Sequence, residues 1–296
     1  MSLPFPVGVL DPGAHDVRGT LEVAAAVDSS GYGRYWLTEH HDEGAPHGNP
    51  SMVAAMVAGV TSTMRVGPCG VLLRYYTPLA VANEATLLEA LFPGRVDFGI
   101  ASARAPSPHA EALGGGLPAD DVAFEERLRV FVAILRRETE LVPLPMGERA
   151  GGAAPPPVWI SGNSDAKAQL AATLGAGLAS SSFHTSVPMS PDTFARYRDA
   201  FAPRPELPAP VTALAVSVLC AETEAEARVF HDVYQRLFGY EQTLIGTPSQ
   251  CVEELAALRH ASGADELLIA PRQNTAAGAI RGLLALAEAL GRSAVG

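Results

Sequence analysis

The chain has 296 residues, of which 48% are hydrophobic and 18% charged, so it can bury the core of one large α/β domain or of two smaller ones. The formal net charge of −11 is spread along the sequence, which argues against nucleic acid or an acidic membrane surface as a partner. No apolar run reaches the roughly 18 residues of a membrane span, and the N-terminus lacks the basic region of a secretion signal. We therefore expect a soluble protein.

The cysteines indicate a reducing environment. Cys69, Cys220 and Cys251 lie far apart in the sequence and form no C-x-x-C motif. An odd number of widely spaced cysteines gives no disulfide framework of the kind found in small secreted proteins. The simplest location for the protein is the cytoplasm.

Strands and helices alternate along most of the chain. Eight short apolar stretches bounded by turn residues are predicted as strands: residues 5–10, 35–37, 64–73, 95–101, 158–160, 177–182, 212–220 and 266–270. Stretches with helical spacing of apolar residues lie between and after them: residues 20–30, 50–63, 78–91, 122–138, 165–174, 191–201, 224–238, 248–262 and 275–290.

This order predicts one domain over residues 1–296, a (β/α)8 TIM barrel with an insertion after strand 4. The alternative is a doubly wound sheet, but residues 11–15, DPGAH, do not match the G-x-G-x-x-G fingerprint that would favour it. Residues 102–121 have no strong period and many Ala, Gly and Pro residues, so we expect a long loop there. Residues 142–157 are rich in Pro and Gly and are predicted as a second lid or connection.

Residues 34–50, RYWLTEHHDEGAPHGNP, carry the densest group of polar side chains at a strand end. Ligands of parallel α/β folds bind at the carboxyl ends of strands, where His40 and His41 fall. Adjacent strand residues point to opposite faces, so we expect one histidine to act and the other to support it. His47 is expected to be exposed in the loop. A metal site formed with Glu39 is the weakest interpretation, because the H-x-H and H-E-x-x-H spacings are absent.

Six segments in order along most of the chain resemble the bacterial luciferase-like flavin monooxygenases. They are YWLTEHH at 35–41, GNP at 48–50, TSTMRVGPCGVLL at 61–73, TPLAVANEATLLEALFPGRVDFGI at 77–100, PPVWISGNSDAKAQLAA at 156–172 and IGTPSQCVEELAAL at 245–258. The resemblance implies a TIM barrel with flavin mononucleotide (FMN) at its carboxyl-end mouth. It further implies that a separate flavin reductase delivers reduced FMN, and that O2 then forms a flavin peroxide, which oxygenates a small or medium organic substrate. The resemblance also implies a homodimer. The Ala and Met content of the helices around residues 52–63 and 78–91 suits a close-packed contact there, and it equally suits burial in a monomer.

The resemblance also implies roles for single residues. His40 matches the histidine that resembling enzymes use as acid or base beside the flavin, and an imidazole pKa near 6.5 suits that task. The alternative is a structural histidine that caps the strand. His41 is assigned to the substrate side as a support, and Phe183 and His184 to the substrate side of the mouth, although these two could equally be core and loop residues.

Two further parts of the flavin site follow from the resemblance. The Cys69-Gly70 pair lies where the family often has a non-prolyl cis peptide under the flavin ring, and the alternative is an ordinary strand with a buried cysteine. A phosphate site needs backbone donors at a helix start with hydroxyl or cationic side chains, and the positions that align with it are Gly162, Asn163, Ser164 and Lys167. The alternative for Ser164 is a simple N-cap.

The chain departs from the family at the end of the fourth predicted strand. Where the family usually has an arginine that binds phosphate, this chain has Ser102, and Arg104 follows two residues later. Either Arg104 takes over this contact, or the phosphate is held without that cation.

Two alternative functions remain open on the sequence. One keeps the fold but uses a deazaflavin for hydride transfer without O2. The other is a barrel that binds flavin without catalysis, or that only pairs with a catalytic subunit.

Overall fold

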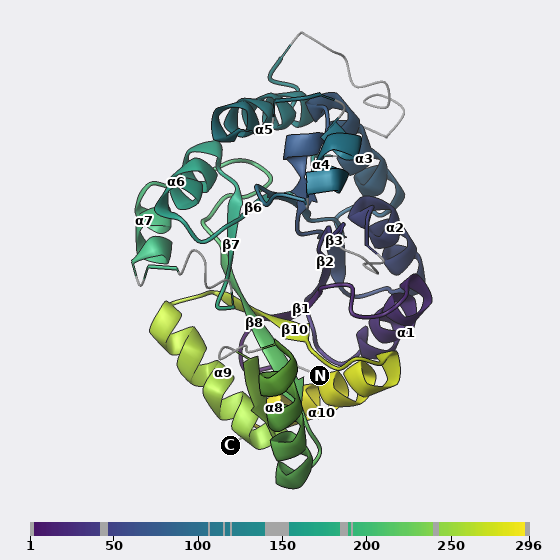
Figure 1. The fold of residues 1–296 in the computed structure, drawn as a ribbon. Coiled ribbons are helices and arrows are strands. Elements are labelled where there is room, and N and C mark those ends of the chain that lie inside the picture. Colours follow the sequence, from purple (N-terminus) through teal and green to yellow (C-terminus); the bar gives the residue numbers. More distant parts are fainter. Residues whose placement is uncertain are drawn as a thin grey trace.

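Strands from the whole length of the chain lie side by side in a ring, and helices surround the ring (Figure 1). The computed structural model describes residues 3–41, 47–105, 107–114, 116–118, 120–139, 154–183, 189–190, 192–238 and 243–293. All pairs of neighbouring strands are parallel. The predicted TIM barrel is confirmed.

The hydrogen-bonded strand order is β3-β2-β1-β10-β8-β7-β6-β5-β4, and β9 pairs with β8 beside this path. The strands are β1 (Val7–Asp11), β2 (Arg34–Leu37), β3 (Arg65–Pro68), β4 (Val71–Leu72), β5 (Phe98–Ala101), β6 (Val158–Ser161), β7 (Gly177–Ser181), β8 (Thr212–Cys220), β9 (Thr243–Gly246) and β10 (Glu266–Pro271).

The ring closes through β3 and β4, which are two halves of the strand predicted at residues 64–73. β3 pairs with β2, and β4 pairs with β5. A bridge between Val66 and Val96 joins the lower half of this strand to the chain leading into β5. β3 ends at Pro68 and β4 begins at Val71, so the two halves are separated at Cys69-Gly70. This is the peptide predicted to lie under the flavin ring.

The helices lie outside the ring (Figure 1). They are α1 (Val17–Val27), α2 (Pro50–Val60), α3 (Pro78–Leu91), α4 (Ser107–Gly114), α5 (Asp121–Leu135), α6 (Asp165–Leu174), α7 (Thr193–Asp199), α8 (Glu224–Phe238), α9 (Pro248–Ser262) and α10 (Ala276–Ser293), with a short 3-10 turn, η1 (Leu73–Tyr75). The side chains of Asp16, Asn49, Asp120 and Ser164 cap α1, α2, α5 and α6 by accepting a hydrogen bond from the backbone N–H three residues later. Among the described residues, no helix has the length and apolar character needed to cross a bilayer.

The structure differs from the expected elements in two places. The predicted loop at residues 102–121 contains α4, which packs against η1. Its sequence, SPHAEALG, is too poor in apolar residues to show a helical period. β9 was not expected, because its four residues show no alternation; it extends the sheet by pairing with residues 217–220 of β8. Of the second expected lid, residues 142–153 lie outside the described residues.

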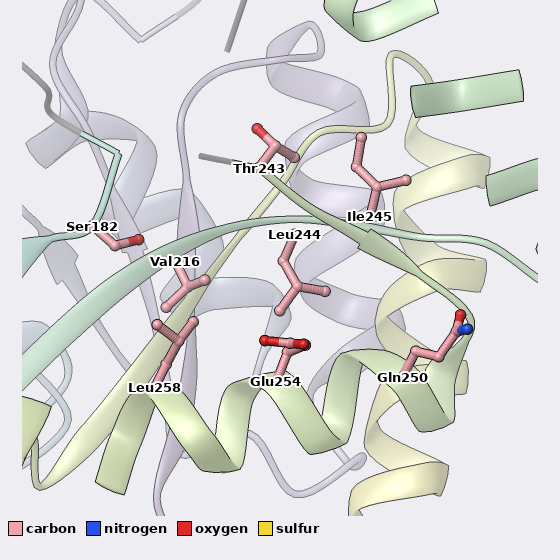
Figure 2. A pocket seen from close by; sticks show the side chains of 8 residues that line it. All are labelled: Ser182, Val216, Thr243, Leu244, Ile245, Gln250, Glu254 and Leu258. Carbon is pink, nitrogen blue, oxygen red and sulfur yellow. The ribbon is translucent and has the colours of Figure 1, made fainter. Parts of the chain in front are cut away.

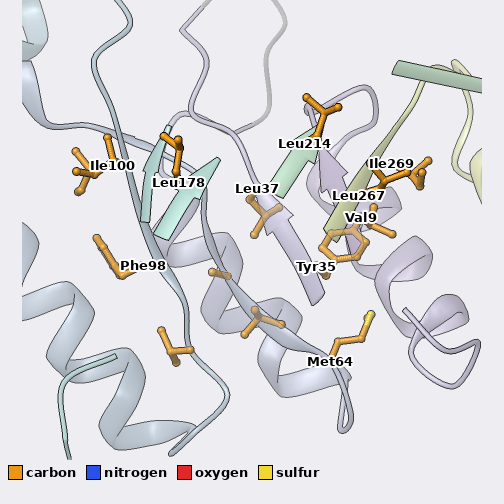
Figure 3. Close-up of a cluster of buried hydrophobic side chains, with 14 of the residues drawn as sticks. Val9, Tyr35, Leu37, Met64, Phe98, Ile100, Leu178, Leu214, Leu267 and Ile269 are labelled. Carbon is orange, nitrogen blue, oxygen red and sulfur yellow. The ribbon is translucent and has the colours of Figure 1, made fainter. Parts of the chain in front are cut away.

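The core has an outer and an inner layer. Outward-facing strand residues such as Val9, Leu37, Ile100 and Leu178 pack with the apolar faces of the helices (Figure 3). A smaller cluster consists of Leu10, Trp36, Cys69, Trp159, Ala179, Ala213, Ala215, Leu268 and Ala270. Two tryptophans with several alanines fill the inside of the barrel, so large and small side chains complement each other there.

A buried charge cluster lies at the amino-terminal end of the barrel. Arg34, at the start of β2, pairs through Nη1 with Asp97 at 2.5 Å and donates through Nε to Glu266 at 2.8 Å. Its guanidinium carbon lies 5.0 Å from the ring centroids of both Trp36 and Trp159. Arg65 adds a second contact to Asp97 at 2.8 Å. Burial would raise the pKa of Asp97, but the two guanidinium groups outweigh it and hold the pKa below its usual value.

We predict that Asp97→Asn destabilises the fold by about 3–5 kcal/mol, because it removes the buried carboxylate shared by Arg34 and Arg65 and leaves only Glu266 to pair with Arg34. The free energy of unfolding in urea measures the effect. Glu224→Gln is the matched control, since it breaks the exposed pair with Arg228 and should cost less than about 1 kcal/mol. Equal effects of the two substitutions would contradict the structural role of the cluster.

His47 is buried, and the expectation that it is exposed is wrong. The side chain is 0% exposed, and its Nε2 lies 3.0 Å from Thr20 Oγ1 on α1. The segment before α2 therefore packs back against α1. Burial lowers the pKa of His47, and this effect outweighs the nearby Asp11 carboxylate, which acts in the opposite direction.

This burial predicts a loss of stability in acid. With its pKa lowered in the folded state, His47 stays neutral there, whereas in the unfolded chain it takes up a proton below about pH 6.5. Stability is thus fully present above that pH and falls below it, by at most about 1.4 kcal/mol per pH unit. The free energy of unfolding in urea should fall less between pH 7.5 and pH 5.5 for His47→Gln than for the wild type. His260→Gln, at an exposed histidine, is the control and should show the same fall in the free energy of unfolding as the wild type.

Candidate active site

The parallel strands bring the predicted residues to one end of the barrel, the mouth. Residues 39–41 follow β2, Cys69-Gly70 precede β4, residues 102–104 follow β5, residues 162–167 follow β6, and Phe183 follows β7. Carboxyl ends of parallel strands share one face, so segments far apart in the sequence meet there. His184 lies outside the described residues.

A buried carboxylate organises the end of β2. Glu39 is 4% exposed and accepts three hydrogen bonds: from His41 Nε2 at 2.6 Å, from the Tyr76 hydroxyl at 2.7 Å and from the Leu72 backbone N–H at 2.8 Å. It therefore ties the strand end to β4 and to the turn that follows. Glu39 was predicted only as a weak metal ligand; its spacing of two residues from His41 was the available signal, since such residues share one face of a strand.

The two histidines have different surroundings. The His41 ring is held by Glu39 and lies 6.5 Å from the His109 ring on α4, in a near-parallel arrangement. His40 is half-buried, and its backbone N–H donates to the His47 carbonyl at 3.4 Å. The Glu39 carboxylate thus orients His41, as a supporting residue requires. The acid/base role of His40 stays a prediction.

The Cys69-Gly70 peptide bond is cis. Gly70 is required by close packing, because a Cβ there would lie 2.7 Å from Ala101 N and Ile100 C on β5. Cys69 packs in the inner cluster with Trp36 and Trp159, and Phe183 contacts the same cluster. Burial raises the pKa of the Cys69 thiol to about 12, and Asp97 adds to the shift, so the thiol is neutral and unreactive near pH 7. Cys69 can serve as an apolar surface.

The segment after β6 combines a helix start with a cation. Ser164 caps α6 by accepting from the Lys167 N–H at 3.3 Å, and Asn163 exchanges two hydrogen bonds with the Ser181 backbone on β7. A Cβ on Gly162 would lie 2.9 Å from Lys167 Cγ, so glycine leaves room for the lysine stem. The N-cap role of Ser164 is therefore present, and the predicted phosphate contacts of these residues stay a prediction.

Arg74, which the sequence analysis did not select, lies beside Ser102. Its Nε donates to the Ser102 carbonyl at 2.6 Å, and its guanidinium carbon lies 5.1 Å from the Phe124 ring centroid. It also pairs with Asp121 at the start of α5. A cation is thus present next to the position where the resembling family has its arginine. The only sequence signal was a charged residue directly after an apolar strand.

A cavity of about 600 Å³ lies between β8, β9 and α9 (Figure 2). It is lined by Ser182, Val216, Thr243, Leu244, Ile245, Gln250, Glu254 and Leu258. None of the predicted site residues that the structure describes lines it. Phe183, the next residue after Ser182, lies 5.1 Å from the Arg272 guanidinium carbon, and Arg272 Nε donates to Ser217 at 2.6 Å. The cavity therefore adjoins the mouth on the β7–β8 side.

Solved structures share this fold over the whole chain. Apo-MsnO8 is 29% identical and superposes with a TM-score of 0.84, over 97% of this chain and 98% of that chain. The oxygenating constituent of 3,6-diketocamphane monooxygenase from Pseudomonas putida, solved with FMN, has a TM-score of 0.70 at 19% identity, over 99% and 98%. An F420-dependent secondary alcohol dehydrogenase has a TM-score of 0.73 at 14% identity, over 98% and 99%. The last two likenesses show the fold alone.

Sequence comparison identifies the family. A protein of Escherichia coli strain K12 described as a luciferase-like monooxygenase is 30% identical over 227 residues, which are 74% of this chain and 65% of that relative. The chain thus spans about two thirds of that relative's length. The family profile described as luciferase-like monooxygenase matches residues 1–242. With its closed parallel barrel and this match over most of its length, the chain belongs to the luciferase-like monooxygenase family.

Proposed function

We propose that the protein is the oxygenase of a two-component system, which binds reduced FMN from a separate flavin reductase and uses it with O2 to oxygenate a small or medium organic molecule. The observation that carries this proposal is that the start of α6, with Lys167, and an apolar surface around Cys69 lie at the same barrel mouth. The family membership supports the reaction class.

The residues at the mouth fit a flavin phosphate. The start of α6 offers backbone donors, and Lys167 and Arg74 add positive charge at the Phe124 ring. The Ser181 hydroxyl is buried and has no hydrogen-bond partner among the described residues, so it could accept or donate to a ligand. An anion bearing several acceptor oxygens suits this set of donors.

The apolar side of the mouth fits a flat ring. Cys69 is neutral and packs with Trp36 and Trp159, and Phe183 contacts the same cluster. When bound, reduced FMN would supply the two electrons with which O2 is activated. His40 would give or take a proton at its imidazole, since its ordinary pKa lies near the working pH. Glu39 holds the neighbouring His41 ring in place.

The two alternatives use the same mouth. A deazaflavin also carries phosphate and would transfer hydride without O2; a protein of the same fold is described as F420-dependent. A non-catalytic subunit would bind flavin without using His40. The family match supports the oxygenase.

The reaction of O2 with the protein and reduced FMN tests the proposal. Mixing the anaerobic complex with air should give a transient absorbing species distinct from both reduced and oxidised flavin. His40→Ala should lower substrate turnover by about 10²–10⁴-fold, the usual contribution of a proton-transferring group, while flavin affinity changes little. His260→Ala, an exposed histidine on α9, is the control. Turnover unaffected by His40→Ala would refute its role, and binding of F420 without any reaction of O2 would favour the deazaflavin alternative.

The same proposal includes a homodimer through α2 and α3. These helices contact each other and expose large apolar side chains that are 42–59% accessible: Met52, Met56, Val60, Leu87 and Leu91. They are adjacent on the outer ring (Figure 1). An apolar face of this kind on a soluble protein supports a contact with a second copy.

We predict that Met56→Lys shifts the protein towards the monomer, because it places a charge in the centre of the buried contact. Sedimentation velocity at micromolar concentrations measures the change. Val229→Lys, at an exposed valine on α8, is the control and should leave the dimer intact. A wild-type protein that sediments as a monomer would remove this part of the proposal and leave the proposed chemistry in place.

A further inference from the structure

Cations gather at the mouth next to the carboxyl ends of β4, β5 and β6. Arg74 is nearly buried, with a side chain that is 4% exposed, and Lys167 is half-buried. Both lie over the Phe124 ring, with the guanidinium carbon at 5.1 Å and the ammonium nitrogen at 4.5 Å from its centroid. Arg127 supports this arrangement by donating to the Arg74 carbonyl at 2.7 Å. A single aromatic ring thus holds two cations near each other.

Two carboxylates of α5 act on these cations: Glu125 acts on Lys167, and Asp121 acts on Lys167 and pairs with Arg74. Arg74 Nη2 donates to Asp121 Oδ1, yet the Asp121 side chain is 73% exposed. The hydrogen bond from Arg74 and its charge lower the pKa of Asp121, and Lys167 and Arg104 contribute in the same direction. Asp121 is therefore ionised near pH 7, and three cations act on it together. An ion pair with one buried and one exposed partner can open on the exposed side by rotation of one side chain.

Two contacts that do not involve Asp121 hold the Arg74 side chain. Its Nε donates to the Ser102 carbonyl at 2.6 Å, and the Phe124 ring lies against its guanidinium. The guanidinium would therefore stay in place when Asp121 moves away. A phosphate monoester carries close to two negative charges and three acceptor oxygens, so it would pair with Arg74 and Lys167 better than one carboxylate does.

We propose that Asp121 is an intramolecular counter-ion that occupies part of the phosphate site, and that the phosphate of FMN displaces it to bind Arg74 and Lys167. This inference rests on the proposed function. It assigns to Arg74, with Lys167, the contact that Ser102 cannot make, and it gives exposed Arg104 a secondary role. The need to displace Asp121 weakens FMN binding, which suits a cofactor that passes between two proteins.

Calorimetric titration with photoreduced FMN and riboflavin, under anaerobic conditions, tests the proposal. Asp121→Asn should tighten binding of FMN about tenfold, because one competing charge is removed, and should leave riboflavin binding unchanged. Glu126→Gln is the matched control, since Glu126 is exposed on the same helix and the substitution makes the same change in net charge. It should change neither affinity by more than about twofold.

A second variant locates the phosphate. Lys167→Met should weaken FMN binding about tenfold without changing riboflavin binding, and added NaCl should reduce the preference of the wild type for FMN over riboflavin. FMN binding that Lys167→Met weakens but Asp121→Asn leaves unaltered would overturn the role of Asp121 and keep the phosphate at α6. Equal tightening of FMN and riboflavin by Asp121→Asn would also overturn it. If no variant binds FMN, both this inference and the proposed cofactor are wrong.

Discussion

The barrel depends on one buried guanidinium at its amino-terminal end. The Arg34 guanidinium lies 5.0 Å from the ring centroids of both Trp36 and Trp159, which contact each other, and it joins Asp97, before β5, to Glu266, at the start of β10. An isolated charge in this place would be costly, so the paired carboxylates and the two rings must be present together. These contacts link strands from the beginning, middle and end of the chain. They hold the closed ring at one end and leave the opposite end available for a ligand.

At that opposite end, the candidate site consists of short polar segments that follow several different strands. Glu39 joins the ends of β2 and β4 through three hydrogen bonds, and Asn163 joins the loop after β6 to β7. The scaffold is thus rigid around the inner apolar cluster. The cations lie at its rim, where Asp121 is exposed and can move. A packed surface for the flavin ring, and Asp121 as a counter-ion that the phosphate can replace, are compatible with a cofactor that binds reversibly.

The predictions from the sequence agree with the structure where a feature depends on neighbouring residues, and they fail where it depends on residues far apart in the chain. The eight barrel strands were predicted because a buried parallel strand is a continuous apolar run, and α6 was predicted because Ser164 and Asp165 begin it. β9 was missed because its strand partner is β8, more than twenty residues earlier in the chain. The bonds of Glu39 to Leu72 and Tyr76 and the pair of Arg74 with Asp121 were missed because these partners lie 33, 37 and 47 residues away.

The sequence by itself determined the alternation of strands and helices, the family, and the set of strand ends from which a site could be built. These features depend on periodicity, helix caps and short segments, which are all set by residues close together in the sequence. Only the tertiary structure decided which groups meet: that His47 is buried against Thr20, that Glu39 accepts from Leu72 and Tyr76, and that Arg74 stands beside Ser102 with Asp121 as its partner. Closing the barrel creates these contacts, because it brings together side chains whose separation along the chain carries no signal.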